Sequence, residues 1–303
     1  MLPRWCIRNN TEMKLKSGFT QVSHCMTLVR KHDYEHYLCT LLLPKPVQPV
    51  VFALRSYNIE VALIKDTVSE VAIGKMKLTF WRDAINTIFK KGSNDKLPDH
   101  PVVNLLAQAV KECNLNKIWL SRLLDARETD LTRTSYHQTK ELEDYCENTS
   151  SSLFYLTLEA LGIKDVHSDH VASHIGKAQG IVTLLRAAGY YRSKRQVLIP
   201  LDILMRHGSS QEEFLRGEAT PSLINSTYDL ASLANAHLLK AISLADKIPK
   251  GAAARVFLPA VATRSFLEDL ERVDFNPYSE RLRLRRPSLP MTLLWKAFRN
   301  KYY

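Results

Sequence analysis

Glycine is scarce in this sequence. Only 10 of its 303 residues are glycine, whereas the turns of Rossmann, P-loop and β-rich folds use many of them. The five cysteines have no paired spacing, and neither CxxC nor HExxH occurs. We therefore expect no disulfide framework and no zinc site of a recognised type, and a reducing compartment fits the thiols best.

Long apolar runs are also missing. No stretch approaches the ~18 consecutive apolar residues of a typical membrane-spanning helix. Hydrophobic residues make up 45% of the chain and charged residues 24%, which is ordinary for a soluble globular protein. We therefore expect no spanning helix, and the length allows one substantial core or two domains.

Acidic residues are outnumbered by basic ones, 31 to 42, which gives a net charge of +11. Such a balance favours nucleic acid, anionic lipid or diphosphate partners. The local basic runs, 192–195 and 281–286, are also typical of a solvated face. Because no groove-reading motif accompanies the charge, we expect no nucleic-acid partner.

Apolar residues at helical spacing predict helices along most of the chain. Thr139 is predicted as the N-cap of one helix, and another is predicted to break near Asn114. With no convincing strand pair, repeat or long linker, the sequence predicts an all-α, single-domain fold over 23–280. The predicted helices are 34–43, 50–72, 73–90, 102–131, 140–161, 169–191, a short one ended by Gly208, 222–247, 251–271 and 290–300.

The two ends of the chain differ from this domain. Residues 1–22 are basic and poor in acids, which is compatible with a mitochondrial transit segment and equally with a disordered leader. Residues 281–303 form a basic amphipathic tail. This tail is predicted either to pack on its own domain or to contact a membrane or partner, with the contact residues Arg281, Arg283, Arg285, Arg286 and Trp295.

Carboxylates are absent from one whole segment, GKAQGIVTLLRAAGYYRSKRQVLIP (176–200). Its first half is apolar nearly all round, which is typical of a buried central helix. Arg186 lies in this helix, and a buried guanidinium needs a partner. We expect Asp66 or Asp130 to supply that partner.

Other candidate metal ligands have simpler interpretations. Asp125, Glu128 and Asp130 are spread around a helix, so ion-paired or solvated acids are favoured over a metal site. His170 and His174 share a helix face, but no third ligand stands at a recognised spacing. The serine run NTSSSLF (148–154) lacks the context of a nucleophile and is interpreted as helix packing.

The order of segments resembles the squalene/phytoene (trans-isoprenyl diphosphate) synthases. The resemblance extends collinearly over about 34–275, through PVVFALRSYNIEVALIKD (49–66), FWRDAINTIFKKG (80–92), LLDARETDL (123–131), the segment 136–162, the frame of Gly176, Arg186 and Pro200, and ARVFLPAVATRSFLEDL (254–270). It implies an isoprenoid synthase-like helical bundle around a central cavity.

In that family, aspartates on two facing helices bind Mg²⁺, which neutralises the diphosphate leaving group. Overlaying the motifs places Ala62 and Leu63 at the first aspartate pair, with Asp66 kept. The second motif has Ala187 and Tyr191 at its aspartate positions and Tyr190 where an acid is usual. The resemblance thus implies degenerate metal motifs, with no catalytic residue, metal or cofactor, and Arg186, Asp125 and Asp130 as residual pocket residues.

Within the family, the chain resembles a mitochondrial branch that has lost these aspartates. This resemblance implies a non-enzymatic factor on the matrix side of the inner membrane that assists assembly of respiratory complex I. Its implied partners are complex I subunits or other assembly factors and the peripheral membrane surface. Two alternatives stay open, namely an active prenyl transferase using Asp66, Asp125 and Asp130, and a protein that binds a lipid or isoprenoid without turnover.

Overall fold

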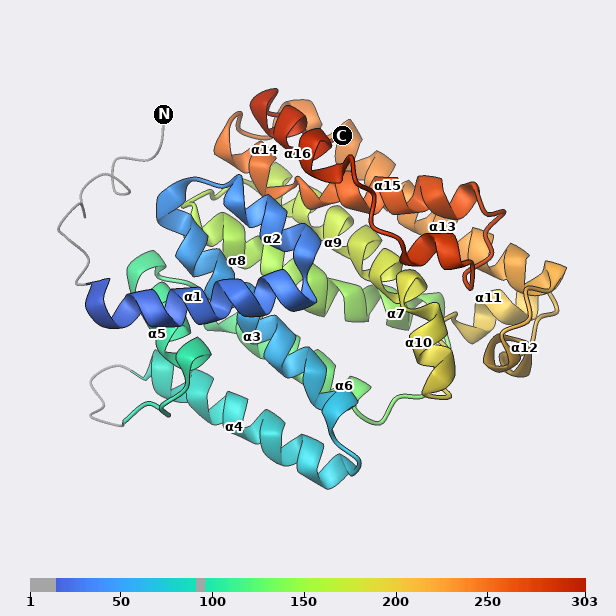
Figure 1. Cartoon of the computed structure of the whole chain (residues 1–303), viewed down its shortest axis with the longest axis horizontal. Helices are drawn as coiled ribbons and strands as arrows, with labels where there is room; N and C mark the ends of the chain where they lie inside the picture. Colours follow the sequence, from blue (N-terminus) through green and yellow to red (C-terminus); the bar gives the residue numbers. More distant parts are fainter. Residues whose placement is uncertain (1–14, 91–95) are drawn as a thin grey trace.

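Helices make up the regular structure of this chain. A computed structural model describes residues 15–90 and 96–303, and over these ranges it contains helices and turns and no strand (Figure 1). The helices are α1 (Leu15–His32), α2 (Tyr34–Leu41), α3 (Gln48–Thr67), α4 (Val71–Phe89), α5 (Pro101–Cys113), α6 (Lys117–Asp130), α7 (Thr139–Cys146), α8 (Ser152–Ala160), α9 (Val166–Arg186), α10 (Ala188–Ser193), α11 (Leu201–Arg206), α12 (Gln211–Arg216), α13 (Pro221–Ser243), α14 (Ala252–Val256), α15 (Pro259–Glu271) and α16 (Leu289–Phe298).

The all-α prediction is confirmed, and the helices differ from their predicted ranges mainly at breaks. The predicted break near Asn114 is confirmed, as the range 102–131 is two helices, α5 and α6, and Asn114 adopts left-handed backbone angles with φ 50°. The predicted helix 169–191 ends at Arg186, since Ala187 leaves helical geometry with ψ 11°. The predicted helix 251–271 divides before Pro259, which lacks the N–H needed to continue a helix.

Thr139 is not the N-cap that the sequence predicts. It is the first residue of α7, and Gln138 precedes it. Its backbone N–H and hydroxyl both donate to the carboxylate of Asp202, at 2.9 and 2.8 Å. A carboxylate distant in sequence therefore satisfies this helix start, which local pattern cannot reveal.

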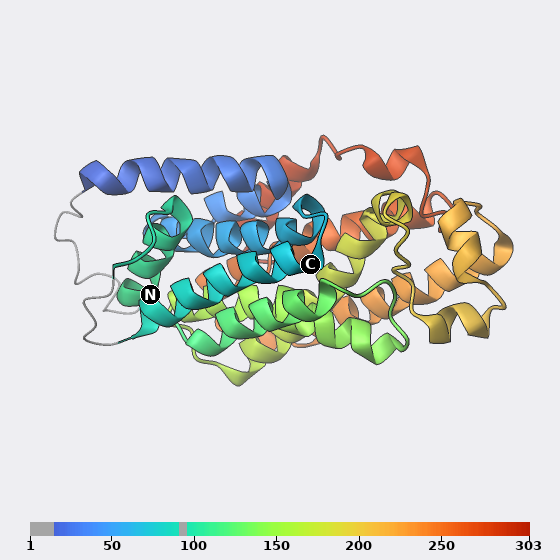
Figure 2. The same cartoon turned by 90° about the horizontal axis from the view of Figure 1, so that it is seen from below.

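Helix α1 was not predicted, and it begins within the range 1–22 interpreted as a leader. Residues 1–14 lie outside the described residues. In α1, Cys25 and Val29 are fully buried one turn apart and belong to the main core. Ser56 of α3 donates its hydroxyl to the carbonyl of Cys25 at 3.3 Å, so α1 is bound to the central helices (Figure 2).

The core consists of two large buried clusters joined by α9. One cluster lies under α1, α3, α5, α6 and α8, and the other lies among α7, α11, α13 and the second half of α9. Figure 1 shows α9 running diagonally through the molecule, with α13 and α15 above it and α3 below. The predicted burial of this helix is confirmed, as Ile175, Ala178 and Ile181 are all fully buried.

Two glycines let α9 approach its neighbour closely. Between α7 and α8 the chain makes a π-helical turn, η3 (Glu147–Ser151). A Cβ added to Gly176 would lie 2.5 Å from Cα of Ser151, and one added to Gly180 would lie 2.5 Å from Sγ of Cys146. These glycines, spaced i and i+4, face consecutive parts of the chain, Gly176 the backbone of η3 and Gly180 the end of α7.

We expect Gly176→Ala to lower the free energy of unfolding by about 2–4 kcal/mol, because the new methyl group meets backbone that cannot move aside. Urea unfolding followed by circular dichroism measures the change. Gly189→Ala is the matched control, since its Cβ would meet only the flexible end of Arg283, at 3.4 Å. An unfolding free energy for Gly176→Ala within about 0.5 kcal/mol of wild type contradicts this account of the packing.

Candidate functional site

A cavity of about 330 Å³ lies between α3, α9 and α10. Its lining includes all the positions that the sequence assigns to the former metal motifs, namely Ala62, Leu63, Asp66, Ala187, Tyr190 and Tyr191. They come from the C-terminal half of α3 and from the α9–α10 junction. The tertiary structure thus brings the two motifs, more than a hundred residues apart in sequence, to one cavity.

Asp66 and Tyr190 join the two walls of this cavity. The Tyr190 hydroxyl donates to Oδ1 of Asp66 at 2.7 Å. Burial, reinforced by the Asp66 carboxylate, raises the pKa of Tyr190 to about 12, so the phenol keeps its proton at neutral pH. The one acid kept from the first motif therefore accepts a hydrogen bond from the residue that stands at an acid position of the second.

Asp130 also lines the cavity, and it is only 6% exposed. Its Oδ2 is 3.1 Å from Nζ of Lys65, and its Oδ1 is 4.0 Å from a guanidinium nitrogen of Arg133. Lys65 also donates to the carbonyl of Arg133 at 3.1 Å. This half-buried cluster neutralises the Asp130 carboxylate within the protein.

Asp125 does not line the cavity, contrary to its prediction as a residual pocket residue. It is 59% exposed and 2.8 Å from Arg82 of α4. Arg82 also binds Glu128 at 2.6 Å. The sequence favoured ion-paired surface groups for Asp125 and Glu128, and both pair with Arg82. Their spacing on α6 directs them away from Asp130.

Arg186 pairs with neither Asp66 nor Asp130, so that prediction is wrong. Its guanidinium is 2.9 Å from Glu35 of α2 and lies over the ring of Phe266, 5.0 Å from the centroid. The side chain is 37% exposed, because Arg186 ends α9 and points to the groove beside α2. It lines that neighbouring groove of about 630 Å³, together with Arg283, Arg285 and Arg286.

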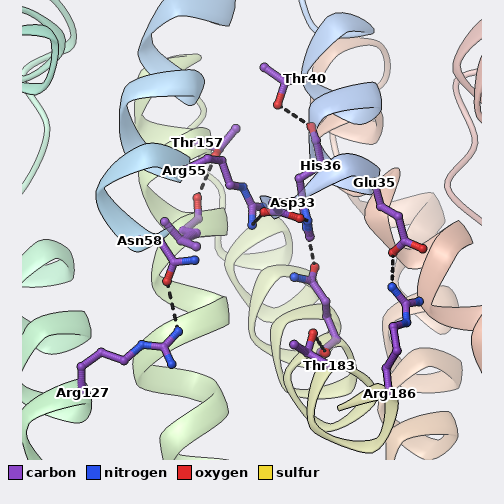
Figure 3. A network of polar contacts seen from close by, with 12 residues as sticks. Asp33, Glu35, His36, Thr40, Arg55, Asn58, Arg127, Thr157, Thr183 and Arg186 are labelled. Carbon is purple, nitrogen blue, oxygen red and sulfur yellow. Dashed lines mark hydrogen bonds and ion pairs between the residues drawn. The ribbon is translucent and has the colours of Figure 1, made fainter. Parts of the chain in front are cut away.

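A polar chain that the sequence interpretation missed lies deep in the cavity (Figure 3). Asp33 accepts from Nδ1 of His36 at 2.6 Å, and Nε2 of His36 lies 3.0 Å from Oε1 of Gln179. Asp33 Oδ2 is also 3.8 Å from the guanidinium of Arg55, which is 5% exposed. A lone arginine in the apolar run VVFALRSY was the available signal, because a buried guanidinium requires a partner.

Electrostatics fix the charge state of this chain. Burial alone would raise the pKa of Asp33, but the neighbouring His36 and Arg55 outweigh it and hold that pKa below its usual range. Burial lowers the pKa of Arg55, and Asp33 opposes that effect. Asp33 is therefore ionised at neutral pH and compensates the buried cation.

We expect Asp33→Asn to lower the free energy of unfolding by about 2–4 kcal/mol, because Arg55 would remain buried without a charged partner. Thermal or urea unfolding measures the effect. Asp125→Asn removes one exposed acid of a similar ion pair and should cost less than about 1 kcal/mol. Equal losses in the two variants would contradict the distinction between the buried and exposed pairs.

His170 and His174, which share a face of α9, do not contact a common partner. His174 instead meets His237 of α13, with 2.9 Å between their Nδ1 atoms, and His237 Nε2 is 2.9 Å from Glu143 of α7. Helix packing selects the partner from another element, because His237 lies across the α9–α13 contact. Burial first, and then the neighbouring His237, lower the pKa of His174 to about 4.

The histidine pair should make stability fall in mild acid. An unfolded His titrates near 6.5, so as pH drops from about 6.5 towards 4 the unfolded chain binds a proton that folded His174 resists. After allowance for solvent screening, we expect a loss of about 1–2 kcal/mol from this source. Urea unfolding at pH 7 and pH 5 should show a weaker pH dependence for His174→Asn than for wild type, whereas exposed His24→Asn should change nothing.

Magnesium does not fit the residues at the former motifs. Ala62, Leu63 and Ala187 have no side-chain oxygen, while Asp66 and Asp130 are already bound by Tyr190 and Lys65. Within residues 15–90 and 96–303, no three His, Cys, Asp or Glu side chains are grouped so as to hold a metal ion. Mg²⁺ requires several oxygen ligands at once, and these walls do not provide them.

The tail packs on its own domain through α16, which is one of its two predicted interpretations, and contact with a membrane or partner stays a prediction. Leu289, Leu293 and Ala297 of α16 are buried against α2 and α15. Arg286 forms a bidentate pair with Asp269 and binds Glu268 at 3.0 Å, so it belongs to the domain surface. Among the described helices, none has both the length and the apolar character to cross a membrane.

The fold and the paired motif positions define an isoprenoid synthase-type helical protein, and the chain belongs to the squalene/phytoene synthase family. The model of that family matches residues 29–292. A squalene synthase from Alicyclobacillus acidocaldarius has the same fold, with a TM-score of 0.76, 17% identity, and coverage of 86% of this chain and 97% of that one.

Relatives with higher identity have a different description. The proteins described as NADH dehydrogenase (ubiquinone) complex I, assembly factor 6, from Rattus norvegicus and from Homo sapiens are each 47% identical to this chain. Each match extends over 279 residues, which is 92% of this chain and 82% of the relative.

Proposed function

We propose that this chain is a non-enzymatic assembly factor for mitochondrial respiratory complex I, built on a synthase fold that has lost its Mg²⁺-binding aspartates. The observation that carries the proposal is the composition of the cavity walls. Ala62 and Leu63 face Ala187 and Tyr191 across the cavity, and the kept acid, Asp66, is bound by Tyr190. The 47% sequence identity to relatives described as complex I assembly factors supports a role in assembly and not in catalysis.

The chemistry of prenyl transfer explains why these walls matter. Loss of diphosphate develops negative charge that must be neutralised while the bond breaks. Two cations of the lining are paired with acids, Lys65 with Asp130 and Arg55 with Asp33. A third, Arg127, donates to the hydroxyl of Tyr145 and to the side-chain oxygen of Asn58. Without carboxylates placed to hold Mg²⁺, the cavity lacks the metal ions that would neutralise a leaving diphosphate.

Purified protein should therefore release no diphosphate from farnesyl or geranylgeranyl diphosphate in the presence of Mg²⁺. In cells that lack the corresponding assembly factor, the chain should restore complex I, and Asp66→Ala should restore it equally well. Native gels and NADH dehydrogenase activity measure the restoration. Mg²⁺-dependent diphosphate release that Asp66→Ala abolishes would refute the proposal and favour an active transferase.

We further propose a location on the matrix side of the inner mitochondrial membrane, with the targeting segment inside residues 1–22 and before the part of α1 that packs on the core. The basic character of 1–22 and of the tail supports this proposal. The partners are then complex I subunits or other assembly factors. Proximity labelling from the chain in mitochondria should enrich early complex I subunits, and deletion of 287–303 should reduce that enrichment.

A second candidate function keeps the cavity as a binding site for a lipid or isoprenoid without turnover. Its volume of about 330 Å³ is within the range of small-molecule sites, and Ile59, Val61, Leu78 and Leu153 provide an apolar part of its wall. Native mass spectrometry of the purified protein tests this function. A co-purified lipid supports it, and the absence of both a bound lipid and a thermal shift with isoprenoids argues against it.

A further inference from the structure

Helix α16 presents an apolar face to solvent. Met291, Leu294, Trp295 and Phe298 are 69%, 53%, 57% and 78% exposed. Their spacing of three, one and three residues places them on one side of the helix. The rings of Trp295 and Phe298 stack, with 6.3 Å between their centroids. Several large apolar side chains that share one short exposed face mark an interaction surface.

The opposite face holds α16 rigidly in place. Leu293 is fully buried, and Leu289 and Ala297 are nearly so. Beyond the helix, Tyr302 is 2% exposed and donates its hydroxyl to the carbonyl of Ala241 at 2.8 Å. The exposed apolar residues therefore belong to a helix whose opposite side is buried. Rotating the helix to bury them would expose Leu289, Leu293 and Ala297 instead.

The charged side chains that the tail itself contributes have one sign. Residues 281–303 contain no Asp or Glu, while Arg281, Arg283, Arg285, Arg299 and Lys301 are exposed. Arg299 lies over the ring of Trp295, 5.7 Å from its centroid, which places a cation beside the apolar face. Arg285 lies over the ring of Tyr34 at 4.5 Å, and Leu284 beside it is 75% exposed.

We infer that the α16 face, defined as Met291, Leu294, Trp295 and Phe298 with the flanking cations, docks on the surface of a bilayer that contains anionic phospholipid. An interfacial helix of this kind inserts its apolar side chains at the level of the headgroups, and its cations meet lipid phosphates. Tryptophan is favoured at that depth, because its ring is apolar and its N–H is polar. The uniform positive charge complements a negative membrane surface.

This inference deepens the proposed membrane location and rests on the proposed function only for its biological setting. Binding to vesicles tests the surface whether or not the chain assists complex I assembly. If the chain fails to restore complex I in cells but binds vesicles, the assembly role is wrong and the membrane surface stands. If it restores complex I but does not bind vesicles, the membrane surface is wrong and the assembly role stands. The two outcomes are therefore distinguishable.

The experiment is vesicle flotation of the full chain. Vesicles of phosphatidylcholine mixed with phosphatidylglycerol should carry the protein upward, and vesicles of phosphatidylcholine alone should carry much less. Salt should weaken the binding, because exposed charges are screened. The double variant Trp295→Ser/Phe298→Ser should reduce the affinity at least about tenfold through the lost apolar burial. Arg281→Gln/Arg283→Gln should reduce both the affinity and its dependence on salt.

The matched control is Met76→Ser/Met205→Ser. These methionines are 72% and 78% exposed, and α4, which carries Met76, lies at the edge of the molecule opposite α16 (Figure 1). The control should float as wild type does, and all variants should keep the wild-type melting temperature. The inference is overturned if wild type does not bind the anionic vesicles, if the α16 variant binds as wild type does, or if the control loses as much binding.

Discussion

The close contact between α9 and the turn η3 is the constraint on which the rest of this structure depends. Gly176 and Gly180 bring the helix so near that side chains larger than hydrogen would collide with Ser151 and Cys146. With its axis fixed there, α9 separates the two buried clusters and presents its far end to α3. The position of the cavity thus depends on two positions in α9 that have no side chain.

The cavity lies at the positions that the sequence comparison assigns to the family's metal motifs, and its walls are joined by direct interactions. A tyrosine hydroxyl from α10 donates to Asp66 of α3. Two other acids of the lining are paired inside the protein, Asp130 with Lys65 and Asp33 with Arg55, while Arg127 donates to Tyr145 and Asn58. Direct hydrogen bonds and ion pairs within the protein therefore connect the walls of the cavity.

The helices could be predicted from the sequence because their signals are local. Apolar spacing, Pro259 and the left-handed Asn114 act over a few residues, and most predicted ranges agree with the structure apart from such breaks, although α1 and α12 were not predicted. The side-chain partners could not be predicted in this way. Arg186 pairs with Glu35, and His174 with His237, because α2 and α13 cross α9 at those points. A crossing point depends on packing over the whole chain.

The sequence by itself determined the fold class, the family and the absence of carboxylates from 176–200, because periodicity and residue identity are local properties. Only the tertiary structure decided where that segment lies and what it contacts. It placed Asp130 in the cavity and Asp125 on the surface, although both belong to α6. It also divided the tail into a buried side and an exposed apolar side. The physical reason is that burial and pairing are set by which helices meet, and this depends on side-chain volumes far apart in the sequence.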